Sequence, residues 1–151
     1  MVKKRNGRKR PKRKANPDPK KSPQIQTGVQ ESFQGHKIRW SFSILDMGGP
    51  FGWSKCSVSV LNDVLKPRLS NFETMTWAEI ESHRHHSIPT GDLSTQAQKR
   101  LSDKKLSDVD EVFSLAIGSK ERIIGIRDRD VFKLLWWDPK HEVCPSTKRH
   151  T

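Results

Sequence analysis

Three apolar runs near the C-terminus decide the fold: FSLAI at 113–117, RIIGIR at 122–127 and VFKLLWW at 131–137. β-Branched and aromatic side chains at this density are typical of strands. Only residues 118–121 separate the first two runs, and only residues 128–130 separate the last two. Loops this short predict consecutive antiparallel hairpins, which make a three-stranded meander. The last two runs are apolar at nearly every position, so we expect central strands covered on both faces.

A further strand is predicted before the meander. Residues 38–45 read IRWSFSIL, and their apolar side chains alternate with polar ones as in a half-buried strand. The inward set consists of Ile38, Trp40, Phe42 and Ile44.

The segment that begins at residue 58 has helical spacing. Its apolar residues are Val58, Leu61, Val64 and Leu65. We expect Pro67 to end or kink this helix near Lys66, because proline lacks the amide donor that an interior helical position needs. Leu69 and Phe72 continue the same face.

Two shorter helices are predicted after it. Thr76 and Glu79 have the spacing of a capping box, which starts a helix with Trp77 and Ile80 inward. Ser94 or Thr95 can cap the second. In that helix Leu93, Ala97 and Leu101 share the inward face, whereas Lys99 and Arg100 point outward.

The order of these elements predicts an α+β domain over residues 35–151. It consists of a small antiparallel sheet, built from the N-terminal strand and the C-terminal meander, with two or three helices on one face. A chain of 151 residues has room for one such domain. Residues 1–34 carry four prolines and almost no large apolar residue, so we expect a disordered tail.

The tail holds most of the excess charge. Residues 1–21 contain eleven of the 29 basic residues and one of the 17 acids, and the formal net charge of the chain is +12. Such a tail attracts polyanions by counterion release, although a solubilising extension has the same composition. Its densest block contributes Lys9, Arg10, Lys12, Arg13 and Lys14 as candidate nucleic-acid contacts.

No apolar run is long enough for a secretory signal or a membrane span, so we expect a cytoplasmic protein without membrane contact. Cys56 and Cys144 lack a CxxC spacing, which argues against a disulfide scaffold. The pair His83 and His86 offers two metal ligands at most, whereas structural zinc needs four. We therefore expect no metal and no cofactor, and a polar patch at residues 83–86.

The segments RIIGIR at 122–127 and WWDPKH at 136–141, together with the order of elements, resemble the RelE/ParE-like toxin superfamily of bacterial toxin-antitoxin systems. The resemblance covers roughly residues 36–145. It implies a RelE-like arrangement, a ribosome-dependent messenger RNA endoribonuclease that uses 2′-hydroxyl attack, and RNA, the ribosome and an antitoxin protein as partners. Other members of this fold inhibit gyrase instead.

Cleavage by 2′-hydroxyl attack needs a proton acceptor and cations that stabilise the phosphorane. The predicted catalytic residues are Arg127 and Arg129 for the phosphate and His141 as acid or base, because the chain contains no tyrosine. Lys140 and Lys148 are predicted as secondary phosphate contacts. In the alternative interpretation Arg127, Arg129 and His141 are solvated turn residues.

Two other functions remain compatible with the sequence. One is a non-catalytic nucleic-acid-binding or ribosome-associated protein, in which the basic tail supplies the affinity. The other is a protein-interaction module whose tail meets an acidic partner. The sequence does not define the oligomeric state.

Overall fold

The structure is a computed structural model that describes residues 32–145 of the chain. The chain forms two units, Met1–Glu31 and Ser32–Thr151. The candidate nucleic-acid contacts of the tail and Lys148 lie outside the described residues.

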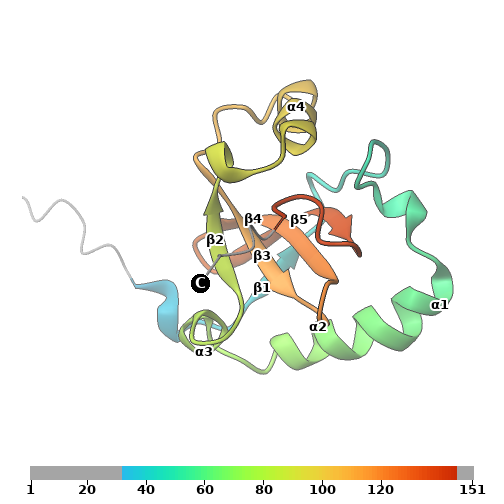
Figure 1. The fold of residues 1–151 in the computed structure, drawn as a ribbon. Coiled ribbons are helices and arrows are strands. Elements are labelled where there is room, and N and C mark those ends of the chain that lie inside the picture. The colour runs from blue at the N-terminus through green and yellow to red at the C-terminus, as the bar shows by residue number, and fades with distance from the viewer. Residues whose placement is uncertain (1–31, 146–151) are drawn as a thin grey trace, which may run out of the picture. The chain divides into compact units, whose positions relative to one another are not determined.

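A five-stranded sheet forms the centre of the second unit (Figure 1). The strands β3, β4 and β5 make the antiparallel meander that the sequence predicts. The prediction of a purely antiparallel sheet of four strands was wrong on two points, because β1 pairs with β5 in parallel and a strand, β2, was missed. In spatial order the strands are β1 (Arg39–Ser41), β5 (Val131–Asp138), β4 (Arg122–Asp128), β3 (Glu111–Ala116) and β2 (His86–Pro89).

The two edge strands explain these differences. β2 ends in Pro89, which suggests a loop in the sequence, but an edge strand tolerates proline because one side of its backbone needs no partner. The other edge strand, β1, is only three residues long. The alternation beyond it does not bury side chains as predicted, since Phe42 is 66% exposed.

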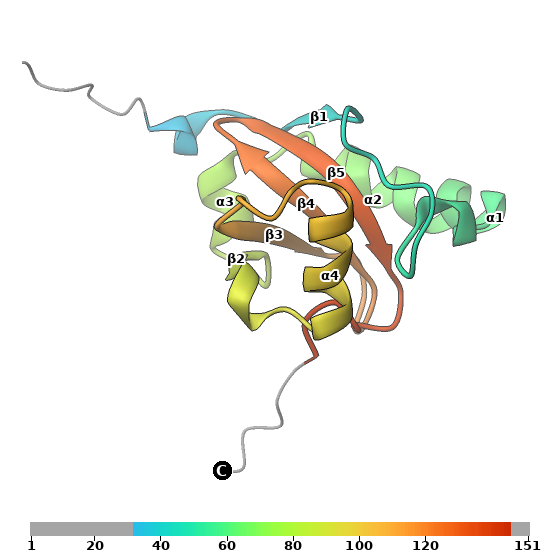
Figure 2. The ribbon, with the colours of Figure 1, turned by 90° about the horizontal axis from the view of Figure 1, so that it is seen from above.

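Helices cover both faces of the sheet, so the prediction of helices on one face was wrong. Figure 2 shows α4 (Thr95–Asp103) in front of the sheet and α2 (Lys66–Phe72) and α3 (Trp77–Glu81) behind it. Each face has its own apolar core. Phe72, Trp77 and Ile80 pack with one face of the meander, and Ala97 and Leu101 pack with the other. Both faces must be covered because the central strands are apolar on both.

The helix before Pro67 deviates from its predicted face. It runs from α1 (Val58–Val60) through a π-helical turn, Leu61–Leu65, directly into α2, with Pro67 in the first turn of α2. A π-helical turn rotates the side chains that follow it relative to those before it. Consequently Leu65 is buried, whereas the other three apolar residues of the predicted face are exposed: Val58, Leu61 and Val64.

The two short helices begin as predicted. Thr76 and Glu79 form both hydrogen bonds of a capping box at α3. The Ser94 side chain accepts the amide hydrogen of Ala97 and caps α4. None of the helices within residues 32–145 is long and apolar enough to cross a membrane.

Arg100 on α4 points inward instead of outward. Its Nε and Nη2 each donate to the buried Asp46 carboxylate at 2.8 Å, and Trp136 Nε1 donates to the same carboxylate at 3.0 Å. Burial opposes the charge on Asp46, but the bonds from Arg100 and Trp136 outweigh it and lower the pKa of Asp46. The network joins α4 to β5 through Asp46, which lies in the loop after β1.

Both adjacent tryptophans of β5 lie in the apolar cores, and a bulge directly precedes them. Ile124 pairs with Trp136 whereas Gly125 pairs with Leu134, so Leu135 is the extra residue. Trp136 then faces α4 with Leu135, and Trp137 faces α2 and α3. Gly125 allows the close approach, because a Cβ atom there would lie 2.4 Å from the Lys133 carbonyl oxygen.

Candidate functional site

A polar pocket lies on the α4 side of the sheet, where β4 begins and β5 ends. Its volume is about 410 Å³. Four strands, the segment after β2 and the segment after β5 contribute its titratable and polar side chains: His86, Ser87, Asp92, Ser114, Arg122, Asp138, His141 and Cys144. The sheet register explains the grouping, because His86 pairs with Ser114 and Arg122 pairs with Asp138.

His86 presents one ring nitrogen as a base. Its Nδ1 lies 3.1 Å from the Ser87 carbonyl oxygen. A carbonyl oxygen only accepts hydrogen bonds, so Nδ1 carries the proton when the ring is neutral. Nε2 of neutral His86 then has a free lone pair and can accept a proton.

Arg122 supplies a positioned cation. Its Nη1 donates to the carbonyl oxygens of Gly118 at 3.0 Å and Glu121 at 2.9 Å, and its Nη2 donates to Ser119 at 3.3 Å. Burial and the neighbouring Arg84 lower the pKa of Arg122, while Asp138 and Glu121 oppose this shift. The guanidinium stays charged, because arginine does not deprotonate in proteins.

His141 lies in a turn that Asp138 holds closed. The two carboxylate oxygens of Asp138 accept the amide hydrogens of Glu142 and Val143, both at 2.9 Å. His141 itself has a φ of 59°, in the left-handed region that non-glycine residues seldom adopt. Further along, the Val143 carbonyl oxygen accepts the Ser94 amide hydrogen at 2.8 Å, so the segment passes the N-terminus of α4 (Figure 2).

Together these groups can bind an anion and transfer protons. Arg122 offers fixed N–H donors, which suit a phosphate because a guanidinium can hold two of its oxygens. The two histidines line the same pocket, and histidine can act as a base or an acid near neutral pH. These are the functions that phosphodiester cleavage by 2′-hydroxyl attack requires.

The structure does not bring all the predicted catalytic residues together. Arg127 and Arg129 lie at the β4–β5 hairpin, whereas His141 follows the far end of β5. Five residues separate Arg127 from Arg122, which corresponds to about 17 Å along a strand. One phosphate group cannot contact both Arg127 and His141.

Arg127 and Arg129 have partners of their own. The Arg127 guanidinium lies 4.0 Å from the ring centroid of Trp77 and forms an ion pair with Glu81. Arg129 has a φ of 60° in the hairpin turn, and its Nε lies 3.4 Å from Asp128 Oδ1. These contacts fit an interpretation in which Arg127 is a framework residue and Arg129 is a turn residue. Lys140 is exposed in the turn before His141. Its predicted contact with phosphate stays a prediction.

Sequence reasoning missed His86, Ser114 and Arg122 as members of this pocket. The short loop between β4 and β5 could have revealed Arg122, because a short hairpin loop fixes which residues of the two strands face each other. Counting from Asp128 and Val131 places Arg122 beside the end of β5, and hence near His141. His86 and Ser114 gave no such signal, because β2 was not expected.

The histidine cluster at residues 83–86 does not act as a unit. His85 is buried, and its Nδ1 accepts the Ala116 amide hydrogen at 2.9 Å. His86 lines the pocket on the α4 side, whereas His83 and His85 line a different pocket. Within residues 32–145, no three His, Cys, Asp or Glu side chains are arranged to hold a metal ion.

Comparison with known proteins found no match: no family model fits the chain, and neither a curated protein nor a solved structure is significantly similar to it.

Proposed function

We propose that this protein is a RelE-like toxin that acts as a metal-independent endoribonuclease on ribosome-bound messenger RNA. The observation that carries the proposal is the pocket in which Arg122, a positioned cation, is accompanied by His86 and His141. The resemblance of residues 122–127 and 136–141 to the toxin superfamily supports messenger RNA as the substrate.

The proposed reaction is an attack of the RNA 2′-oxygen on the adjacent phosphorus. His86 Nε2 accepts the proton of the 2′-hydroxyl as the new P–O2′ bond forms. The P–O5′ bond breaks, and His141 in its protonated form donates a proton to the leaving 5′-oxygen. The products are a 2′,3′-cyclic phosphate and a free 5′-hydroxyl group.

Arg122 stabilises the charge that accumulates on the phosphorane oxygens. Three of its five N–H groups donate to carbonyl oxygens and hold the guanidinium in place, which leaves the other two for the phosphorane with little reorganisation during the reaction. Asp138 holds the turn that carries His141 and acts as a positioning residue.

The direct test is to add the purified full chain to a reconstituted translation system and to analyse the ends of the messenger RNA. We expect cuts within the coding region that leave 2′,3′-cyclic phosphate and 5′-hydroxyl ends. Intact messenger RNA, in the presence of salt-dependent RNA binding, would contradict the proposal and indicate a non-catalytic nucleic-acid-binding protein.

A further inference from the structure

Three arginines of the described residues have no carboxylate partner within 4.0 Å. The other four each form an ion pair with an Asp or Glu: Arg39, Arg100, Arg127 and Arg129. The three without one, Arg68, Arg84 and Arg122, come from α2, from the segment before β2 and from β4. An arginine that keeps its charge without a carboxylate is available to an external anion.

All three arginines donate to the main chain at the end of β3 or in the loop between β3 and β4. Arg68 Nη2 lies 3.4 Å from the Ala116 carbonyl oxygen. Arg84 Nη2 and Arg122 Nη1 both donate to the carbonyl oxygen of Gly118. Neutral acceptors orient the guanidinium groups without cancelling their charge, and each group has further N–H donors.

Arg68 and Arg84 line a second pocket, of about 550 Å³, on the side of the sheet that α2 and α3 cover. His83, His85, the last residue of β3 and the loop residues 117–119 complete much of its wall. The Nε atom of Arg68 is buried and has no hydrogen-bond partner among the described residues. A buried donor without an acceptor is costly, so the Arg68 guanidinium is not fully satisfied by the protein itself.

The surroundings of His85 show how positive this pocket is. Burial, followed by the charges of Arg68, His83, Arg84 and Arg122, lowers the pKa of His85 to about 4. His85 is therefore neutral at pH 7, and the cations around it are the arginines.

We propose that this second pocket binds a phosphate group of the RNA chain, next to the linkage that is cleaved beside Arg122. The assignment of the phosphate to RNA rests on the proposed function, whereas the anion site rests on the arginine cluster alone. Clusters of arginine recognise phosphate through paired N–H donors. The shared Gly118 carbonyl oxygen places the two pockets at opposite sides of one loop, so a single RNA strand that crosses the loop can reach both.

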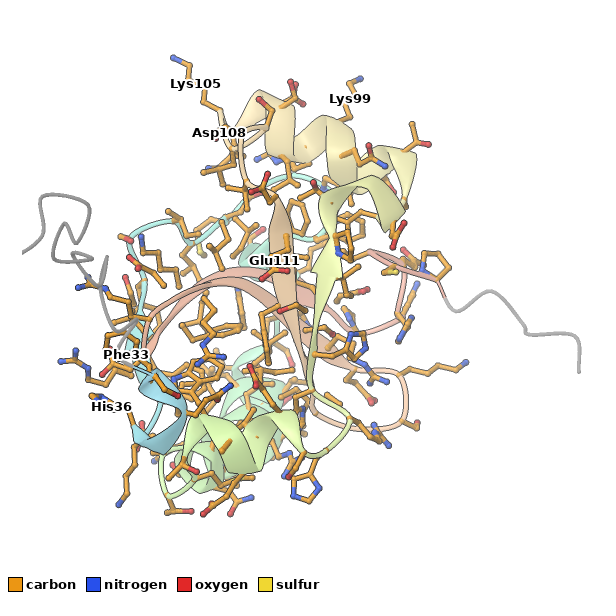
Figure 3. All side chains as sticks on the ribbon, turned by 90° about the vertical axis from the view of Figure 1, so that its left-hand side faces the viewer. Phe33, His36, Lys99, Lys105, Asp108 and Glu111 are labelled. Atoms are coloured by element: carbon orange, nitrogen blue, oxygen red, sulfur yellow. The ribbon has the colours of Figure 1, made fainter. Side chains whose placement is uncertain are left out.

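The test measures binding of a short 2′-O-methyl RNA, which lacks the nucleophile and is not cleaved. Fluorescence anisotropy is recorded with the full chain and with Arg84→Gln, Arg68→Gln and Lys99→Gln. Lys99 is the matched control, because it undergoes the same change of charge and projects from α4 away from the sheet (Figure 3). Melting temperatures establish that each variant is folded.

We expect Arg84→Gln and Arg68→Gln each to weaken binding about tenfold, as for a lost charged hydrogen bond. The slope of log affinity against log salt should fall by about 0.7 for each lost phosphate contact with a single strand. Lys99→Gln should bind as the parent does. Inorganic phosphate should shift the amide NMR signals of Ala116 and Gly118 in the parent and not in Arg84→Gln.

Equal affinity of folded Arg84→Gln and the parent would overturn the phosphate site, as would capture of polyglutamate in preference to the oligonucleotide. The proposed function can fail separately. If binding depends on Arg68 and Arg84 but the protein cuts no RNA, the phosphate site stands and the proposed function fails. If neither substitution affects cleavage or binding, the phosphate site is rejected and the proposed function stands.

Discussion

His85 and His86, adjacent in the chain, hold opposite ring tautomers. His85 Nδ1 accepts the Ala116 amide hydrogen, so its proton lies on Nε2, whereas His86 Nδ1 faces the Ser87 carbonyl oxygen and carries the proton itself. His85 directly precedes β2 and His86 begins it, and their side chains line pockets on opposite faces of the sheet. His85 is thereby a framework residue, whereas His86 leaves Nε2 for the proton transfer of the proposed reaction.

The buried His85 predicts a pH-dependent stability. Its pKa is lowered to about 4 in the folded chain and is near 6.5 when unfolded. The unfolded state therefore binds the proton more readily, so His85 costs no stability above pH 6.5 and destabilises the fold as the pH falls from 6.5 to 4. The expected loss is about 3 kcal/mol.

The variant His85→Asn isolates this effect, because its amide oxygen can accept the Ala116 amide hydrogen but does not titrate. The free energies of unfolding of parent and variant are compared from pH 7.5 to pH 4. Only the parent carries the titrating group, so between these two pH values it should lose about 3 kcal/mol more stability than the variant does. A constant gap across this range would show that His85 protonates equally well in the folded protein.

Gly125 predicts a strict requirement at the bulge. In Gly125→Ala the new methyl group would lie 2.4 Å from the Phe132 ring and from the Lys133 carbonyl oxygen, so β4 and β5 must separate. We expect a loss of about 1–3 kcal/mol in urea unfolding. Gly35→Ala is the control, because a Cβ atom there has no neighbour within 4 Å. Equal stability of the two variants would argue against this bulge.

Arg127→Ala should affect stability and not catalysis. The substitution removes the contact with Trp77 and the partly exposed ion pair with Glu81, which together should cost about 1–2 kcal/mol. RNA cleavage at a temperature where the variant is folded should stay within about twofold of the parent, far below the effect of losing a transition-state contact. A large loss of cleavage in folded Arg127→Ala would return the phosphate role to the β4–β5 hairpin.

The basic residues of the tail should contribute affinity. Deletion of residues 1–21 removes eleven cations and one acid, which should weaken RNA binding and flatten its dependence on salt. The melting temperature should change little, because the apolar cores of the domain lie within residues 32–145. Unchanged RNA affinity after the deletion would leave the tail as a solubilising extension.

The sequence predicted those elements whose signals are local. The short loops around 118–121 and 128–130 defined the meander, and the Thr76 and Glu79 spacing defined α3. The failures arose where distant contacts decide the outcome. β2 forms because Ile88 pairs with Val112, and Arg100 turns inward because Asp46 lies buried beneath α4.

The candidate site was predicted only in part, for a reason of geometry. His141 was identified from its segment, but its partner on β4 is Arg122 at the start of the strand and not Arg127 near the end. The choice between them depends on which end of an antiparallel pair faces the C-terminal turn. Hairpin register contains that information, whereas residue type does not.

The rate of RNA cleavage by Arg122→Gln tests the central claim most directly. The parent, Arg122→Gln and the charge-matched control Lys99→Gln are compared on ribosome-bound messenger RNA, after circular dichroism has shown that all three are folded. Because Arg122 would stabilise the transition state in the proposed reaction, we predict that Arg122→Gln lowers the single-turnover rate by roughly two to three orders of magnitude. Lys99→Gln should cleave at the parent rate and leave 2′,3′-cyclic phosphate ends. Cleavage by folded Arg122→Gln at the parent rate would contradict the account.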